Sequence, residues 1–182
     1  RRSISRNHSA THLLHEALRT VLGSHVKQSG SSVGPDSLRF DFNHFEKVSA
    51  EDLKKAEDLA NQKVLEAIEV QIDELTIEQA RENGKIKMFF GDKYGDIVRV
   101  VTMDENYSIE LCGGAHVRNT AEIGFIKILS ESSVAAGVRR IEAVTGKGAI
   151  EYVESLNTKI DDLNKNCDEL NAKIHNLEKE IA

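Results

Sequence analysis

The chain has 182 residues, a net charge of −6 at pH 7 and 40% hydrophobic residues. This length suffices for one globular domain plus an extension, and the acidic balance argues against broad, non-specific binding of nucleic acid. The sequence holds two Cys, no signal peptide and no apolar run long enough to span a membrane, so we expect a cytoplasmic protein without a membrane partner. It begins Arg-Arg without an initiator Met, which indicates a fragment of a longer protein.

In chain order, the first expected element is a helix over residues 7–22, because apolar residues recur at intervals of three and four and Gly23 ends the pattern. The motif HSATH lies on this helix. Residues at i and i+4 share a helix face, so His8 and His12 present two imidazoles side by side. His15 leaves a second pairing open. A lone His pair on a helix is more often an ordinary surface feature than a metal site.

The region after this helix is expected to hold a loop, a strand and two helices. Residues 26–37 are polar and contain the single proline, which predicts a loop. LRFDF, residues 38–42, alternates and predicts a strand. Two signals resembling capping boxes then predict helices: Ser49 with Asp52 over 49–68, and Thr76 with Gln79 over 76–83.

From residue 85 the pattern changes to short strands. Helices followed by a run of strands predict an α+β domain, with helices packed on a mostly antiparallel sheet. The motif CGGAH, residues 112–116, falls where a strand gives way to a turn, which is a common place for functional residues. The expected strands are Lys85–Phe90, Ile97–Met103, Tyr107–Leu111, Phe125–Ser130 and Val138–Val144.

The C-terminal segment differs in kind. Apolar residues from Val153 to Ile181 keep a 3-4 spacing over four heptads, which predicts a coiled-coil helix of about 50 Å. Such a stripe needs a partner, either elsewhere in a larger protein or in a second copy of the chain, as a homodimer. Cys167 occupies an a position and is interpreted as an apolar filler. We therefore divide the chain into a domain over 1–149 and the start of a coiled-coil or linker helix over 150–182.

CGGAH supplies a second pair with the same spacing as HSATH. Its double glycine allows a tight turn between Cys112 and His116. Three His and one Cys form a ligand set that tetrahedral zinc accepts, so His8, His12, Cys112 and His116 are the candidate zinc ligands. The ordinary alternative stays open, since the chain has seven His.

Charge is distributed unevenly along the chain. Residues 150–182 carry eight acids and four lysines, which leaves a net charge of −2 for the first 149 residues. Arginines there could bind nucleic acid locally, or they could be solvated or paired with acids. These arginines are Arg1, Arg2, Arg6, Arg118, Arg139 and Arg140.

Several ordered segments resemble the editing domain of alanyl-tRNA synthetase, from about Arg6 to Gly148. Free-standing alanyl-tRNA deacylases of the AlaX type share the two metal motifs, but the last matching segment followed by a heptad helix is more similar to the synthetase. The matching segments are RNHSATHLLHEALRTVLGSHVKQSGS, LRFDFNHFEKVSAEDL, GDKYGDIVRVV, ELCGGAHV and SESSVAAGVRRIEAVTG.

The resemblance implies a deacylase that binds the acceptor end of tRNA(Ala) and hydrolyses the ester of tRNA(Ala) mischarged with serine or glycine. An alanine pocket cannot reject these amino acids strongly, because glycine lacks only a methyl group and serine merely adds a hydroxyl. The ATP-dependent aminoacylation part of such a ligase is absent from the sequence, so the chain itself is not expected to charge tRNA.

Residue by residue, the resemblance implies zinc ligation by His8, His12, Cys112 and His116, and functional roles for two further residues. Thr11 matches a position associated with serine discrimination, and Gln28 matches a position of the editing pocket. The alternatives are a backbone hydrogen bond for Thr11 and a solvated loop residue for Gln28. The family generally has CGGTH, and here Ala115 replaces that Thr, so any hydrogen bond from its hydroxyl is lost.

Two roles for zinc follow. In the first, zinc has an open coordination position and activates water. In the second, all four protein ligands close the shell and zinc is structural. Four protein ligands usually close the shell, which favours the second role. The rival class is a non-catalytic, zinc-stabilised module for tRNA binding or dimerisation. A metalloprotease is disfavoured because HSATH lacks the Glu after its first His. A zinc-bound Cys112 thiolate would also be a poor nucleophile.

Overall fold

A computed structural model describes residues 1–88 and 94–181 and confirms the α+β class. The chain separates into two compact units, Arg1–Gly148 and Ala149–Ala182. Within the described ranges, no helix is long and apolar enough to cross a membrane.

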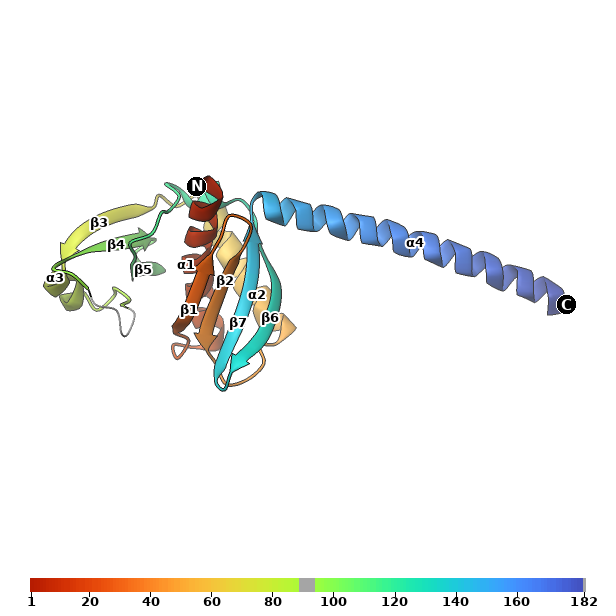
Figure 1. Cartoon of the computed structure of the whole chain (residues 1–182), viewed down its shortest axis with the longest axis horizontal. Coiled ribbons are helices and arrows are strands. Elements are labelled where there is room, and N and C mark those ends of the chain that lie inside the picture. The colour runs from red at the N-terminus through yellow and green to blue at the C-terminus, as the bar shows by residue number, and fades with distance from the viewer. Residues whose placement is uncertain (89–93, 182) are drawn as a thin grey trace. The chain divides into compact units, whose positions relative to one another are not determined.

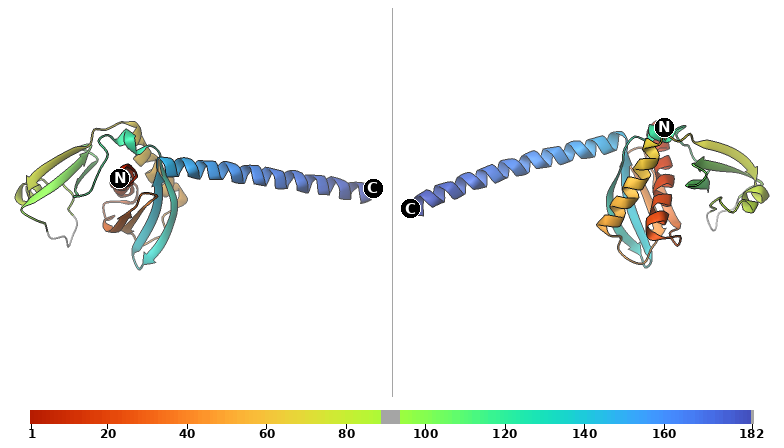
Figure 2. Two further views of the ribbon diagram at one scale, coloured as in Figure 1. Left: turned by 45° about the horizontal axis from the view of Figure 1, so that its top comes forward. Right: turned by 180° about the vertical axis from the view of Figure 1, so that it is seen from behind.

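The larger part of the first unit is a four-stranded sheet covered by two helices. Its strand order is β1-β2-β7-β6, and every neighbouring pair is antiparallel. The two helices α1 and α2 lie on the same face of this sheet (Figures 1 and 2) and enclose the main core, which includes Leu13, Leu18, Phe40 and Ile141. The elements are α1 (Arg2–Leu22), β1 (Gln28–Val33), β2 (Leu38–Asn43), α2 (Ala50–Leu65), β6 (Ile126–Ala135) and β7 (Val138–Thr145).

A second, three-stranded sheet of order β3-β4-β5 carries its own small core with α3. The Thr76 side chain and the Gln79 side chain each bond the other's backbone N–H, which confirms the expected capping box at the start of α3. A 3₁₀ turn, η1 (Thr120–Ile123), follows β5 along the chain. The other elements are β3 (Gln71–Thr76), α3 (Ile77–Glu82), β4 (Ile97–Met103) and β5 (Ser108–Leu111).

Several details of the predicted fold differ from the structure. Part of the expected loop 26–37 is strand β1, because its backbone pairs with β2 although its side chains are polar. Strand β3 was not foreseen, and the single expected sheet is two sheets. Of the expected strand Lys85–Phe90, residues 85–88 contain one isolated bridge, from Lys87 to Glu110, and residues 89–90 lie outside the described residues.

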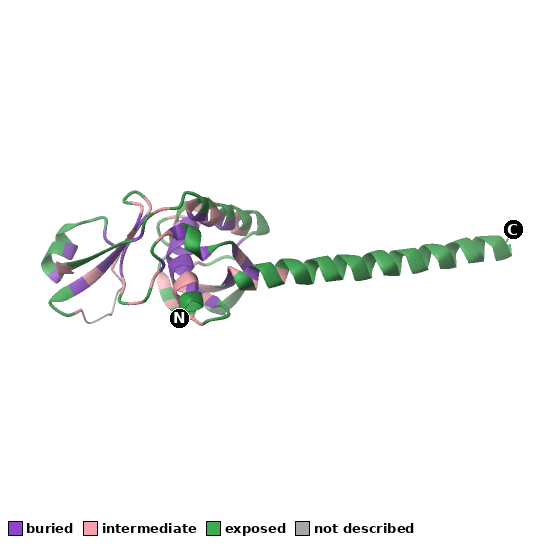
Figure 3. Cartoon of the chain, turned by 90° about the horizontal axis from the view of Figure 1, so that it is seen from above, coloured by how far each residue is buried: buried purple, intermediate pink, exposed green. Residues whose placement is uncertain are grey.

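The second unit continues helix α4 (Lys147–Ile181), which confirms the expected long C-terminal helix. Figure 3 shows exposed residues along almost all of its length. The apolar a and d positions are among them, with Leu163 62% and Leu170 57% exposed. Exposed leucines at heptad spacing leave this helix without an apolar partner inside the described chain.

Leu163→Asp with Leu170→Asp is expected to abolish self-association of the chain, because two charges would enter the apolar seam of a coiled-coil homodimer. Sedimentation velocity over a concentration series measures this change. Ala172→Asp is the matched control, because it adds the same side chain at an outward f position of the same heptads. A dimer that survives both seam substitutions, or a wild-type chain that stays monomeric at all concentrations, would contradict the coiled-coil homodimer.

Candidate metal centre

Two elements distant in sequence bring the four candidate ligands together. Helix α1 supplies His8 and His12 from one face, and the turn after β5 supplies Cys112 and His116. One ligand atom from each residue lies within 4.8 Å of all the others. His12 is buried and the other three are partly buried, so the cluster is shielded but reachable.

The donor set fits zinc in chemistry and in spacing. Cys112 Sγ lies 3.3 Å from His8 Nε2 and 3.3 Å from His116 Nε2. Tetrahedral zinc with bonds of about 2.0–2.3 Å holds its nitrogen and sulfur ligands about 3.3–3.7 Å apart. The three imidazoles and the thiol therefore need little movement to surround one ion.

Charge in the cluster also suits a metal. Burial would raise the pKa of the Cys112 thiol, but hydrogen bonds from His116, His12 and His8 lower that pKa to about 3. The residue is therefore a thiolate at neutral pH, the form that binds metals. Burial would lower the pKa of His12, whereas the Glu110 carboxylate and Cys112 raise it to about 10. Burial lowers the pKa of His116. A bound cation would replace the positive charge that His12 supplies.

Side chains behind the cluster fix the orientation of two rings. The Glu110 carboxylate is buried and pairs with His12 Nδ1, and its other oxygen lies 2.9 Å from His15 Nδ1. The Ser9 hydroxyl lies 3.1 Å from His116 Nδ1 and accepts the Val117 backbone N–H. In His12 and His116, therefore, Nδ1 is held by a neighbouring side chain, which leaves Nε2 to bind a metal.

Glu110→Gln is expected to lower zinc affinity roughly 10- to 100-fold, because the carboxylate that orients His12 and balances its charge is lost. Competition with a chromophoric chelator measures the affinity. Glu74→Gln, on the exposed part of β3, is the matched control and should bind zinc like the unaltered protein. Equal affinity in both variants would show that Glu110 has no part in holding the metal.

The CGGAH turn is packed against His8 at one glycine. A Cβ on Gly114 would overlap the His8 ring, whereas a Cβ on Gly113 would meet nothing within 4 Å. The Arg99 guanidinium donates to the Gly114 carbonyl, and the Arg99 carbonyl accepts the Cys112 N–H at 3.0 Å. Arg99 on β4 therefore holds the turn at two points, and Gly114 lets it approach α1.

Thr11 and Gln28 both lie beside the cluster. Thr11 is buried, and its hydroxyl donates to the Asn7 carbonyl at 2.9 Å, which is the backbone bond considered as the alternative from sequence. Gln28 is the first residue of β1 rather than part of a loop. A chamber of about 60 Å³ joins them to the cluster, and it is lined by His8, Thr11, His12, His15, Gln28, Ser31, Glu110 and Cys112.

Two of the arginines singled out in the sequence pair with acids on the four-stranded sheet. Arg140 Nε and Nη2 donate to the Asp41 carboxylate at 2.7 and 2.8 Å, and the hydrogen bonds from Arg140 lower the pKa of Asp41. Arg139 pairs with Glu131. Arg139 and Arg140 are therefore paired with acids, which was the alternative to nucleic-acid binding.

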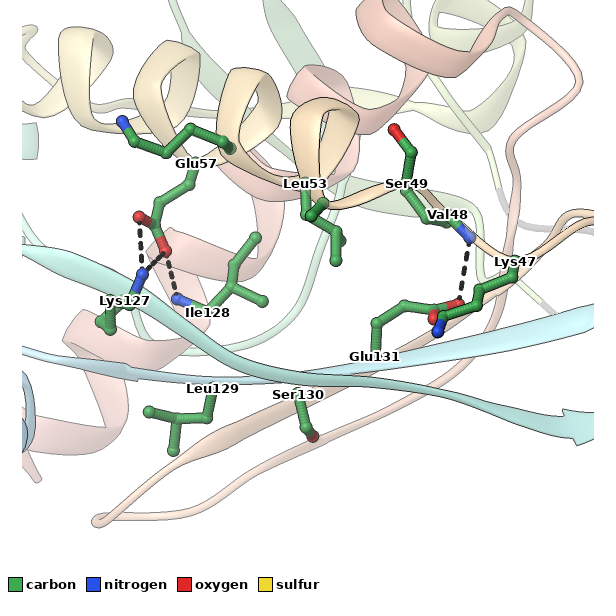
Figure 4. Close-up of a pocket in the computed structure, with 12 residues that line it drawn as sticks. Lys47, Val48, Ser49, Leu53, Glu57, Lys127, Ile128, Leu129, Ser130 and Glu131 are labelled. Carbon is green, nitrogen blue, oxygen red and sulfur yellow. Dashed lines mark hydrogen bonds and ion pairs between the residues drawn. The ribbon is translucent and has the colours of Figure 1, made fainter.

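A hollow of about 630 Å³ between α2 and β6 offers no comparable chemistry (Figure 4). The Glu57 carboxylate in it already accepts Lys127 Nζ at 3.0 Å and the Ile128 N–H at 2.7 Å. Glu131 accepts the Val48 N–H and pairs with an arginine. The carboxylates of Glu57 and Glu131 are therefore already hydrogen-bonded or ion-paired within the fold. For this reason we do not regard the hollow as a candidate active site.

Sequence reasoning did not identify Glu110 and Arg99 as parts of the site. A signal for Glu110 was present, because an acid between two apolar residues of a short strand just before CGGAH indicates a buried charge with a partner. Arg99 carried no such signal, since its side chain reaches Gly114 only through the pairing of β4 with β5.

Part of the chain that includes one half of the cluster matches a known family. Residues 98–142 match the family described as the threonyl and alanyl tRNA synthetase second additional domain. The matched residues include β4 from its second residue, β5 and the turn that carries Cys112 and His116.

Curated relatives that are similar over most or all of this chain are alanine–tRNA ligases. The alanine–tRNA ligase of Carboxydothermus hydrogenoformans is 60% identical over 156 residues, which are 86% of this chain and 18% of that protein. The Bacillus subtilis enzyme is 53% identical over 182 residues, which are 100% of this chain and 20% of that protein. The chain thus spans about a fifth of the length of these curated relatives. The resemblance to alanyl-tRNA synthetase is confirmed.

Proposed function

We propose that the chain is the editing part of an alanine–tRNA ligase in the cytoplasm, and that it hydrolyses the ester of tRNA(Ala) mischarged with serine. The observation that carries this proposal is the small polar chamber beside the metal cluster. Its volume of about 60 Å³ admits only a small amino-acid side chain. A second, sieving site of this size is what an enzyme needs when its first site cannot reject serine or glycine.

Thr11 supports serine as the preferred amino acid. Its hydroxyl proton is donated to the Asn7 carbonyl, so only oxygen lone pairs are left to face the chamber. Those lone pairs can accept the hydroxyl proton of a serine side chain, whereas alanine and glycine have no group to donate. Gln28 lines the same chamber and offers an amide that can orient the ester or a water molecule.

In the proposed reaction a water oxygen attacks the ester carbonyl carbon, and the bond from that carbon to the ribose oxygen breaks. The proton from water passes to the ribose oxygen, so the products are free serine and tRNA. Bound zinc would supply either charge stabilisation or a fixed framework for α1 and the CGGAH turn. The chain itself holds the small side chain against Thr11 and excludes bulk water from the chamber.

A specific observation favours a second candidate, a tRNA-binding module without catalysis. Four donors already face one another in the cluster, which is typical of a closed, structural zinc site. Such a module would bind tRNA(Ala) without releasing the amino acid.

Serine release from Ser-tRNA(Ala) tests the proposal, with Ala-tRNA(Ala) as the control substrate and zinc-loaded and chelated protein compared. We expect serine to be released selectively and only by zinc-loaded protein. Tight binding of Ser-tRNA(Ala) without release would overturn the hydrolase and support the binding module.

Thr11→Val is expected to reduce serine release roughly 10- to 100-fold while glycine release from Gly-tRNA(Ala) changes little, because only the serine hydroxyl uses the lost acceptor. Valine keeps the shape of threonine, so the substitution tests the oxygen alone. Thr158→Val, at an exposed position on α4, is the matched control. Equal losses on both substrates would mean that Thr11 supports the helix rather than the substrate.

A further inference from the structure

A second hollow, of about 880 Å³, borders the metal cluster on the His116 side. It shares no lining residue with the small chamber. Its volume lies within the range of sites that bind ligands of nucleotide size. The lining residues are Arg1, Arg2, Ser5, Arg6, Arg99, Ala115, His116, Val117, Arg118 and Glu122.

Five arginines and one glutamate in one hollow make a concentrated positive charge on a chain with a net charge of −6. In the part of the chain that the structure describes, none of these five guanidiniums forms an ion pair with a carboxylate. Arg2 and Arg118 are exposed, and Arg6 and Arg99 are partly buried. Clustered guanidiniums without acidic partners favour an anionic ligand.

Two of the arginines are fixed in place by backbone carbonyls. Arg6 Nε donates to the Glu122 carbonyl at 2.8 Å, and Arg99 donates to the Gly114 carbonyl. Each of these bonds uses one of the five N–H donors of the guanidinium, so donors remain for phosphate oxygens. The side chains are therefore held in position before a ligand arrives, which lowers the entropic cost of binding.

Helix α1 connects the hollow to the cluster. Ser5 and Arg6 of this helix line the hollow, and Ser9, one turn after Ser5, hydrogen-bonds His116 in the cluster. A ligand in the hollow would therefore lie next to His116 of the metal centre, against residues other than those that line the chamber for the amino acid.

We propose that the arginine hollow holds the sugar–phosphate backbone of the RNA chain whose aminoacyl end enters the small chamber. This inference rests on the proposed function for the identity of that end, and it assigns the phosphate contacts to Arg2, Arg6, Arg99 and Arg118. RNA phosphates are anions repeated along a chain, which matches several guanidiniums spread over one large hollow. Ala115 is exposed and lines the hollow next to His116, so its small side chain leaves room for a sugar at this point.

The test compares binding of uncharged tRNA(Ala) transcript over a range of KCl concentrations. Arg2→Gln with Arg118→Gln removes two charges that hold no other group in place. We expect this variant to bind roughly tenfold more weakly at low salt and to lose about 1–2 units of the slope of log K against log[salt]. Arg81→Gln, an exposed cation on α3, is the control and should change neither quantity appreciably. Arg2→Lys with Arg118→Lys keeps the charge and should keep most of the slope.

Serine release separates this inference from the proposed function. In the Arg2→Gln and Arg118→Gln variant we expect a higher KM for Ser-tRNA(Ala) with kcat nearly unchanged, whereas His8→Ala should lose kcat and still bind uncharged tRNA. An unaltered KM and salt slope in the arginine variant, with normal serine release, would overturn the hollow alone. The unaltered protein could also release no serine while the arginine variant still binds tRNA more weakly than it does. That result would overturn the hydrolase and leave the hollow supported.

Discussion

Replacing His8 or Cys112 with alanine is expected to strip zinc from the protein and to abolish serine release. Each substitution removes a donor that lies 3.3 Å from its neighbour in the cluster. The loss of one of four ligands should lower zinc affinity by at least about 100-fold, because water, a weaker ligand than imidazole or thiolate, must take the fourth position. Metal content after dialysis against a weak chelator, measured together with the thermal midpoint, checks the change.

His25→Ala is the matched control for these two variants. His25 pairs with His44 at 2.9 Å at an exposed position, so its removal deletes a histidine without touching the cluster. This control should retain zinc, and its thermal midpoint should still fall when zinc is chelated, as in the unaltered protein. Tightly bound zinc in both His8→Ala and Cys112→Ala would refute the ligand assignment.

The sequence was most informative where local patterns decide the structure. Helix α1 follows from apolar residues at intervals of three and four, and the Ser49 and Thr76 caps mark the starts of α2 and α3. The spacing of HSATH and CGGAH named four side chains that the fold brings within 4.8 Å of one another. Residues four apart on a helix share one face whatever the rest of the chain does, so the pairing of His8 with His12 could be predicted. The approach of the CGGAH turn to that face depends on the tertiary fold.

Strands β1 and β3 could not be read in the same way. β1 has the sequence QSGSSV and β3 has QIDELT, and neither alternates clearly between apolar and polar residues. Each lies at the edge of its sheet, where one neighbour supplies the backbone hydrogen bonds and solvent covers much of the side-chain surface. Their formation depends on pairing with β2 and β4, which is a property of the tertiary fold rather than of the segment.

The sequence also could not show which arginines are available to bind a ligand. Sequence clustering singled out Arg118 and Arg140 alike, yet Arg140 is neutralised by Asp41 across the β2–β7 pair while Arg118 faces the hollow beside His116. Arg99 was not singled out, although it both holds the CGGAH turn and lines that hollow. Which cations stay available for a ligand is decided by strand register, and register is not visible in composition.

Gly114→Ala is expected to reduce zinc affinity about as strongly as the loss of a ligand. The added methyl group would overlap the His8 ring, so either His8 must leave the cluster or the turn must move away and carry Cys112 and His116 with it. Both movements are opposed by existing contacts, because Arg99 holds the turn to β4 and His12, on the same face of α1 as His8, pairs with the buried Glu110. Serine release should fall together with metal content.

Gly113→Ala is the matched control for the zinc affinity of Gly114→Ala. The two glycines are adjacent, and the same substitution at Gly113 meets nothing within 4 Å, so the added methyl group finds open space. If both variants lost zinc equally, the glycines would matter for the flexibility of the turn, and the close packing of Gly114 on His8 would be irrelevant. If only Gly114→Ala loses zinc, the second glycine of CGGAH is required because the backbone of the turn must lie directly against a metal-binding ring. The motif would then specify a contact between two distant segments, as well as the spacing of two ligands.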